Sequence, residues 1–127
     1  MTDPEPKTTM ASRQELLLKI YGKQTGMIPK ATLVVESGPD KGVRFQVAAW
    51  ESTIGWGEGN NFPLTDKTVS TDHAVIRCYE KGCVIVDQDS KNGTRVNGKE
   101  IFHKLLKDKD QITIGSTLLR FRDPKHR

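Results

Sequence analysis

Two kinds of segment are missing from this sequence: a long apolar run and a secretory signal. No apolar run approaches the ~20 residues that a transmembrane helix needs. Residues 1–30 also lack the apolar core of about 7–15 residues that follows the basic residues of a signal peptide. We therefore expect a soluble protein of the cytoplasm with no membrane partner.

An excess of one charge sign is also missing. Lys and Arg number 20 and Asp and Glu number 16, which gives a net charge of +4, and the two signs are mixed without a basic block. Proteins that bind nucleic acid usually carry a basic stripe, and those that bind single strands interleave aromatic residues with it. The sequence therefore predicts no nucleic-acid partner, whereas a mildly positive surface suits an acidic or phosphorylated one.

Cysteine is scarce, and no pattern of metal ligands is present. Cys78 and Cys83 flank a tight turn, and together with His73 and His103 they do not have the spacing of zinc ligands. A disulfide is one alternative for the two cysteines, but in a cytosolic protein we expect two buried reduced thiols in neighbouring strands. The sequence predicts neither a metal site nor a cofactor.

Motifs for nucleotide binding and catalysis are absent as well. Residues 55–59 read Gly-Trp-Gly-Glu-Gly, but Asn60 replaces the last glycine of the dinucleotide fingerprint and no helix can begin well after it. Ser70, Asp72 and His73 are residue types of a hydrolase triad, but no G-x-S-x-G elbow exists and adjacent strand residues point to opposite faces. We expect no enzyme, and we expect His73 to be a buried residue that joins two loops.

Short strand-like segments separated by turns make up most of the chain. Turn residues recur about every 8–12 residues, which is typical of an all-β sandwich or barrel. A chain of 127 residues is long enough for one domain with a core of its own. We predict an antiparallel β-sandwich, in which Pro63 marks residues 60–64 as an irregular edge. The expected strands span residues 32–36, 43–47, 53–55, 74–79, 83–87, 94–97, 111–115 and 117–121.

The start of the chain differs from the rest. Residues 1–10 are polar with two prolines and read as a disordered tail. Residues 11–21 are predicted to form a short helix, with Ser12 as its N-cap and Glu15 as the capping-box partner. The apolar face of this helix is able to dock on its own domain, on another copy or on a partner.

These patterns divide the chain into three parts. We expect an N-terminal extension over residues 1–30, a sandwich domain over residues 31–122 and an exposed tail over residues 123–127.

Polar turn residues of the sandwich gather in a few short segments. Ser70 and Thr71 offer hydroxyls and backbone N–H groups and Lys91 offers a cation, which are the groups that hold a phosphate. Asn92 begins a strong turn signal, and its side chain is able to brace that turn or to bind the main chain of a peptide. Ordinary turn residues are the alternative interpretation of all four.

The same segments resemble the motif of the forkhead-associated (FHA) domain family. The family pattern Gly-Arg, Ser-x-x-His and Asp-x-x-Ser-x-Asn-Gly-Thr-x-x-Asn-Gly corresponds to residues 55–56, 70–73 and 87–98, and the resemblance covers residues 31–121. The resemblance implies an FHA-type β-sandwich of about eleven strands that binds phosphothreonine in a partner protein or peptide. It implies no catalytic activity.

This resemblance also implies roles for individual residues. Ser70 is similar to the family serine that contacts the phosphate, while Thr71 and Lys91 stand where residues often reach the phosphopeptide. Asn92 resembles the asparagine that hydrogen-bonds the peptide main chain beside the phosphothreonine. The residues implied to hold the loops together are Gly55, His73, Gly93, Thr94 and Asn97.

Trp56 departs from the family pattern, because it stands where the family has its phosphate-binding arginine. Tryptophan has one N–H and no charge, whereas each hydrogen bond from a charged group is worth about 1.5–3 kcal/mol. We therefore expect phosphate binding to be weakened by roughly ten- to a hundredfold. Lys91 and Lys67 would supply part of the missing charge.

Two alternatives to phosphothreonine binding remain. One is a phosphate-independent interaction or scaffold module, in which Trp56 anchors an unmodified partner. The other is a regulator whose Thr8-Thr9 segment resembles the twin-threonine tail of small bacterial FHA regulators and binds its own domain when phosphorylated. The sequence leaves the partner and the oligomeric state open.

Overall fold

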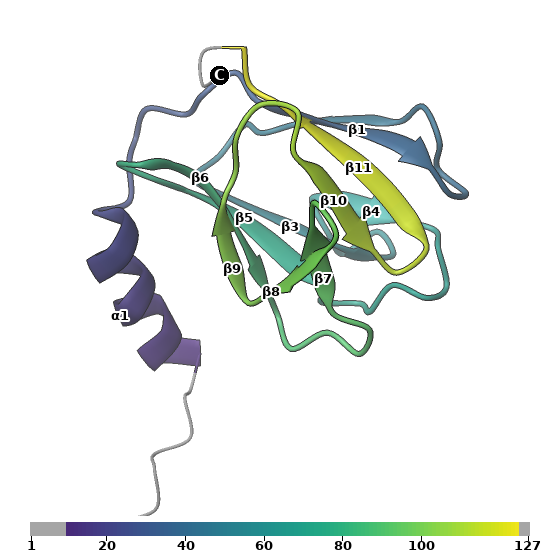
Figure 1. Cartoon of the computed structure of the whole chain (residues 1–127), viewed down its shortest axis with the longest axis horizontal. Coiled ribbons are helices and arrows are strands. Elements are labelled where there is room, and N and C mark those ends of the chain that lie inside the picture. The colour runs from purple at the N-terminus through teal and green to yellow at the C-terminus, as the bar shows by residue number, and fades with distance from the viewer. Residues whose placement is uncertain (1–9, 125–127) are drawn as a thin grey trace, which may run out of the picture.

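The computed structural model describes residues 10–124, in which one helix precedes eleven strands. The strands form two sheets that face each other, and the helix stands against the outside of one of them (Figure 1). This architecture confirms the predicted all-β sandwich with a short helix near the N-terminus. The elements are α1 (Met10–Tyr21), β1 (Thr32–Ser37), β2 (Arg44–Gln46), β3 (Glu51–Trp56), β4 (Phe62–Leu64), β5 (Ala74–Tyr79), β6 (Gly82–Asp87), β7 (Thr94–Val96), β8 (Lys99–Ile101), β9 (His103–Leu105), β10 (Gln111–Ile114) and β11 (Thr117–Arg122).

One sheet has six strands in the order β2-β1-β11-β10-β7-β8, and the other has five in the order β4-β3-β5-β6-β9. Paired strands are antiparallel except β3 and β4, which run parallel at the edge of the five-stranded sheet. In that sheet Ile54 pairs with Ala74, and Ala74 pairs with Asp87. The end of β3, the start of β5 and the end of β6 therefore lie side by side, and the loops that leave these strands meet.

The main core lies between the two sheets. Strand residues that point inward are fully enclosed, among them Leu33, Ile54, Ile76, Ile112 and Phe121 at 0% exposure. Their alternation with exposed residues follows the two-residue period of a strand with one buried face.

Strand β5 is the exception, because all six of its residues are buried. Its inward residues join the main core, while Val75 and Tyr79 point outward and are covered by α1. The helix contributes Leu17 and Tyr21, which are 0% and 8% exposed, to this second apolar cluster. The helix therefore packs on its own domain, which answers a question that the sequence left open.

Polar contacts attach both ends of α1 to the sandwich. The hydroxyl of Tyr21 lies 2.7 Å from Nδ1 of His103, and their rings meet edge to face. Arg13 donates to Asp89 at 2.8 Å, and its guanidinium carbon lies 4.6 Å from the ring centre of Phe102. Because the Arg13–Asp89 pair is partly exposed, we assign most of the docking energy to the buried Leu17 and Tyr21.

Several details of the sequence prediction were wrong. The helix begins at Met10, so Ser12 lies inside it and cannot be the N-cap. Strands β8 and β9 were not predicted, because each consists of three residues that are partly or fully exposed and show no clear alternation. Asp123 was expected to be exposed but is buried, and its N–H donates to Asp108 at 2.8 Å. The disordered tail was predicted over residues 1–10, but Met10 belongs to the helix, and residues 1–9 lie outside the described residues.

The two cysteines are free buried thiols that face each other across β5 and β6. Their sulfur atoms are 3.9 Å apart, and the contact together with burial raises the pKa of the Cys83 thiol. This arrangement confirms that the two cysteines are buried in neighbouring strands, and their reduced state remains a prediction.

The docked helix should make stability depend on pH through His103. Burial lowers the pKa of His103 from its ordinary value of 6.5, so the folded state binds a proton less readily than the unfolded chain. The stability from this group is therefore present above about pH 6.5 and is lost as the pH falls through the lower folded pKa. We expect urea unfolding to show a steeper loss of stability between about pH 7.5 and 5 in the wild type than in His103→Gln. Equal slopes would contradict this assignment.

Candidate functional site

Three loops meet at one end of the sandwich, and we call residues 57–61, 65–73 and 88–93 together the loop cluster. They leave β3, enter β5 and leave β6, the strand ends that the register places side by side. The sequence segments that carry the FHA-like motif therefore reach one common surface, except for the end of the third segment.

Ser70 stands at the junction of the three loops. Its carbonyl accepts from the N–H of Trp56 at 3.0 Å, and its own N–H donates to Nδ1 of His73 at 3.0 Å. Its hydroxyl oxygen accepts from the N–H of Lys91 at 3.0 Å. Since the hydroxyl proton has no acceptor among the described residues, Ser70 retains a donor for a ligand.

His73 is fully buried and joins two of the loops. Its Nε2 lies 2.8 Å from the carbonyl oxygen of Gly93, while Nδ1 accepts the Ser70 N–H. The ring proton must therefore sit on Nε2, where it donates to Gly93. The Ser70 hydroxyl contacts a backbone N–H and not this ring, so the arrangement is not that of a hydrolase triad.

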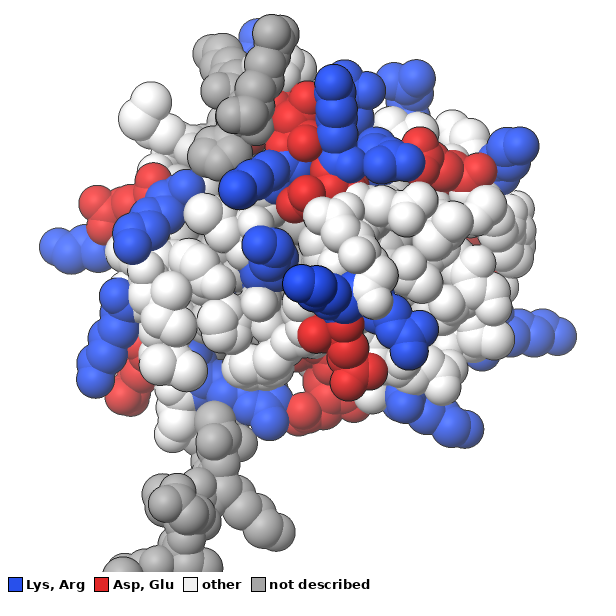
Figure 2. Space-filling model, viewed as in Figure 1, with Lys and Arg blue, Asp and Glu red and all other residues white. Residues whose placement is uncertain are grey.

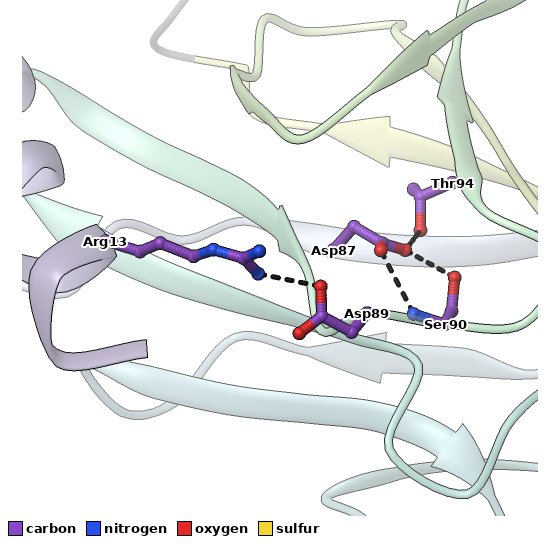
Figure 3. A network of polar contacts seen from close by, with 5 residues as sticks. All are labelled: Arg13, Asp87, Asp89, Ser90 and Thr94. Atoms are coloured by element: carbon purple, nitrogen blue, oxygen red, sulfur yellow. Dashed lines mark hydrogen bonds and ion pairs between the residues drawn. The ribbon is translucent and has the colours of Figure 1, made fainter. Parts of the chain in front are cut away.

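Asp87 holds the shape of the third loop (Figure 3). Its carboxylate accepts from the N–H of Ser90 at 3.1 Å, from the hydroxyl of Ser90 at 2.5 Å and from the hydroxyl of Thr94 at 2.7 Å. Asp89, which lies between Asp87 and Ser90 in the sequence, has a φ of 54°. Aspartate tolerates this left-handed conformation better than most residues. Asp89 is also the residue that binds Arg13, so α1 touches the loop cluster directly.

The side chains predicted to meet a ligand lie at the exposed tips. Thr71, Lys91 and Asn92 are all exposed, and Nδ2 of Asn92 donates to the carbonyl of Thr68 at 2.8 Å. From the sequence, the Asn92 side chain was expected to brace its own turn or to bind the main chain of a peptide. The structure shows instead that Asn92 bridges the second and third loops.

Gly55 and Trp56 occupy the end of β3. A Cβ atom added at Gly55 would lie 2.0 Å from the carbonyl oxygen of Thr71, so only glycine allows the second loop to cross here. Trp56 uses its backbone N–H to hold Ser70, while its side chain is 48% exposed. The tryptophan is therefore a surface residue beside Ser70, as its place in the motif requires.

Asp66 is a structural residue that the sequence analysis missed. Its carboxylate accepts from Thr68, from the N–H of Ser116 at 3.0 Å and from the hydroxyl of Thr117 at 2.8 Å. Although burial raises the pKa of Asp66, these hydrogen bonds together hold it below its ordinary value. The Asp-x-Thr spacing was the signal available, since aspartate often binds its own backbone two residues on.

Asn97 lies away from the loop cluster. It occupies the two-residue turn between β7 and β8 with φ of 51°, followed by Gly98 with φ of 84°, at the opposite end of β7 from Thr94. Its side chain donates to Asp110 at 3.0 Å and accepts from the N–H of Gln111 at 2.9 Å. Asn97 therefore ties the β7–β8 hairpin to the start of β10.

Surface charge and ligand-forming clusters add little to this picture. Figure 2 shows Lys and Arg interspersed with Asp and Glu on the face that it displays. Residues 10–124 contain no group of three or more His, Cys, Asp or Glu that could hold a metal ion. No helix within the same range is both long and apolar enough to cross a membrane.

The two-layer sandwich and its loop cluster define an interaction module built from loops on a rigid scaffold. The chain belongs to the FHA domain family, because the family model described as FHA domain matches residues 52–115. This match confirms the resemblance that the sequence motif indicated.

Two curated relatives and one solved structure illustrate the kinship. The oxoglutarate dehydrogenase inhibitor of Corynebacterium efficiens is 35% identical over 130 residues, which cover 94% of this chain and 90% of the relative. The glycogen accumulation regulator GarA of Mycobacterium tuberculosis is 35% identical over 91 residues, which cover 72% of this chain and 56% of the relative. A structure from a study of phosphothreonine-dependent FHA domain interactions has 32% identity and a TM-score of 0.67, covering 72% of this chain and 94% of that one. The relatives are named as an inhibitor and a regulator, which agrees with the prediction of a non-enzymatic protein.

The close approach at Gly55 can be tested by adding a single methyl group. We expect Gly55→Ala to lower the free energy of unfolding by about 1–3 kcal/mol, because the Thr71 backbone must move. Gly59→Ala is the matched control, since an added Cβ there meets no atom within 4 Å. Urea unfolding of both variants is the measurement. The same midpoint for both would show that the loop crossing does not require glycine.

Proposed function

We propose that this chain is a cytoplasmic phosphothreonine-binding module in signalling, whose affinity for phosphate is weakened or retuned by Trp56. The observation that carries the proposal is the position of Ser70, whose hydroxyl proton is available where three loops meet. The exposed Lys91 follows in the neighbouring loop and brings a positive charge. Membership of the FHA family, and a neighbour studied for phosphothreonine-dependent interactions, support this function.

Each residue of the proposed site has a separate task. Ser70 donates its hydroxyl proton to a phosphate oxygen, and the Lys91 ammonium neutralises part of the phosphate charge. An asparagine side chain has two N–H donors and one carbonyl acceptor. One N–H of Asn92 donates to the carbonyl of Thr68. The remaining groups of Asn92 are left for the main chain of the peptide.

Trp56 limits the affinity of this site. Its indole has no charge, and it cannot form the forked, charge-assisted bonds that an arginine makes to phosphate. Without a bond worth about 1.5–3 kcal/mol, affinity falls by roughly ten- to a hundredfold. The exposed indole of Trp56 instead offers apolar surface. This surface favours a ligand with an apolar side chain near the phosphothreonine.

Peptide titration tests the proposed site. We expect the wild type to bind members of a phosphothreonine peptide library and to ignore the matched unphosphorylated peptides. Trp56→Arg should tighten binding by roughly ten- to a hundredfold, because it restores a charged fork. Ser70→Ala and Asn92→Ala should weaken it, and fluorescence anisotropy with labelled peptides measures all of these changes.

Lysine variants separate a local contact from a general charge effect. Lys91→Ala should reduce affinity, whereas Lys99→Ala removes an equal charge from exposed β8 and should leave it nearly unchanged. Binding of unphosphorylated peptides that Trp56→Ala abolishes would instead favour the phosphate-independent module anchored by Trp56. If neither the wild type nor Trp56→Arg binds any peptide, the phosphothreonine site is refuted.

A second candidate function is self-binding of the Thr8-Thr9 segment after phosphorylation. The observation that favours it is the Arg13–Asp89 pair, which attaches the start of α1 to the loop cluster. Thr9 precedes Arg13 by four residues, so chain connectivity keeps their Cα atoms within about 14 Å of each other. A phosphothreonine there would meet the site at a high effective concentration, which offsets the loss of the arginine.

Phosphorylation of the full chain tests this second function. We expect phosphorylated Thr8 or Thr9 to shift the NMR signals of Ser70 and Asn92 without any added partner and independently of protein concentration. It should also reduce the affinity for an added phosphothreonine peptide, because the two compete for one site. Thr8→Ala and Thr9→Ala, made singly, identify the threonine responsible. Unchanged loop signals after complete phosphorylation would exclude self-binding.

A further inference from the structure

The outer face of the six-stranded sheet carries a hollow of about 370 Å³ on β1, β2 and β11. The outward residues of these strands are partly or fully exposed, whereas α1 covers part of the outer face of the other sheet. The loop cluster belongs to the ends of the five-stranded sheet and contributes no residue to the lining. We call this feature the arginine hollow, and its lining residues are Thr32, Val34, Glu36, Arg44, Arg120 and Arg122.

The strand register places the three arginines around two small residues of β1. Val34 pairs with Arg44 on one side and with Arg120 on the other. Thr32, two residues earlier on the same face, pairs with Arg122. Given the strand spacing of about 4.8 Å and the rise of about 3.4 Å per residue, the Cα atoms of Arg44 and Arg122 lie roughly 12 Å apart on opposite sides of β1. The short side chains of β1 leave the space between the two arginines open.

Two of the three guanidiniums retain unused donors. The side chain of Arg44 is exposed and forms no hydrogen bond or ion pair with residues 10–124. Arg122 donates through its Nε to Asp108 at 3.2 Å, and its side chain is 49% exposed. A guanidinium has five N–H donors, and its planar fork matches the geometry of a carboxylate. The hollow therefore presents two forks that can each accept a further anionic partner.

Arg120 is the fixed centre of the hollow. Two of its nitrogens donate to Glu36, at 2.9 and 3.2 Å, and Nη1 donates to the carbonyl of Lys109 at 2.9 Å. Glu36 is thus already paired, and three guanidiniums surround this one carboxylate of the lining. The excess of positive charge favours an anionic ligand.

The lining also separates a protein partner from a nucleic acid. It contains no aromatic residue on which a base could stack, and the Glu36 carboxylate would repel a continuous phosphate backbone. Separate carboxylates on a peptide avoid that repulsion, because they can be spaced to meet the arginines alone.

We infer that the arginine hollow binds an acidic segment of a partner protein. One carboxylate of this segment accepts from Arg44, and a second, two residues further along an extended chain, accepts from Arg122. Two carboxylates are needed because a single exposed ion pair contributes little. The contact requires no phosphothreonine, so it goes beyond the proposed function and does not depend on it.

Peptide titration followed by NMR tests this inference on the full chain. The probe is acetyl-Glu-Gly-Glu-Gly-Glu-amide in buffer of low ionic strength, and its control has glutamine in place of each glutamate. We expect the acidic peptide to cause saturable shifts of the backbone amide signals of Thr32, Arg44 and Arg122, and the glutamine peptide to cause none. Equal shifts with both peptides, no saturable shift with either, or shifts confined to Ser70 and Asn92 would overturn the inference. Tighter binding of an oligodeoxythymidine at the same residues would also overturn it, in favour of nucleic acid.

Variants then locate the contact. Arg44→Gln and Arg122→Gln should each weaken binding of the acidic peptide by about two- to fivefold, because each removes one exposed ion pair. Arg44 is an exposed residue outside the core, so Arg44→Gln tests the contact without a loss of folding. Arg95→Gln is the matched control, since Arg95 is an exposed residue of β7 in the same sheet and lies outside the hollow. Its affinity should equal that of the wild type, and equal affinity of all three variants would refute the site.

Discussion

The bridge through His73 is the interaction on which the functional end of this sandwich depends. A fully buried imidazole must pair both of its nitrogens, and it does so with the N–H of Ser70 and the carbonyl of Gly93. Either bond, if lost, leaves a buried polar group unpaired, which costs about 1–3 kcal/mol. The positions of the two loops are thus set from the interior, and the exposed side chains at their tips are positioned with them.

The helix adds a second constraint, because it covers part of the outer face of the five-stranded sheet and buries a second apolar cluster there. Leu17 and Tyr21 cover that face, which explains why both faces of β5 are buried. The same helix reaches the loop cluster through Arg13 and Asp89. Asp89 therefore belongs to a loop that α1 also holds, so the position of the helix and that of the loop cluster are connected.

The sequence predicted those features that repeat or that need a particular residue at a particular turn. Strand-like segments such as those of β1, β6 and β10, together with recurring turn residues, indicated a sandwich whose polar turn residues gather in a few segments. Short strands such as β8 (Lys99–Ile101) could not be predicted, because their exposed residues form no buried face. Asp66 was missed because its partners Ser116 and Thr117 lie far along the chain, where only the three-dimensional fold brings them together.

Trp56 differs from the family motif without a change of fold. Its structural task belongs to the backbone, since the N–H holds the Ser70 carbonyl whatever side chain the residue carries. The neighbouring Gly55 is constrained by contact with the Thr71 backbone, but the exposed indole is not constrained by any core packing. The arginine of the family motif is therefore needed for charge and not for architecture. Under the proposed function, its replacement lowers the affinity for phosphate, while Ser70, His73 and the loops keep their places.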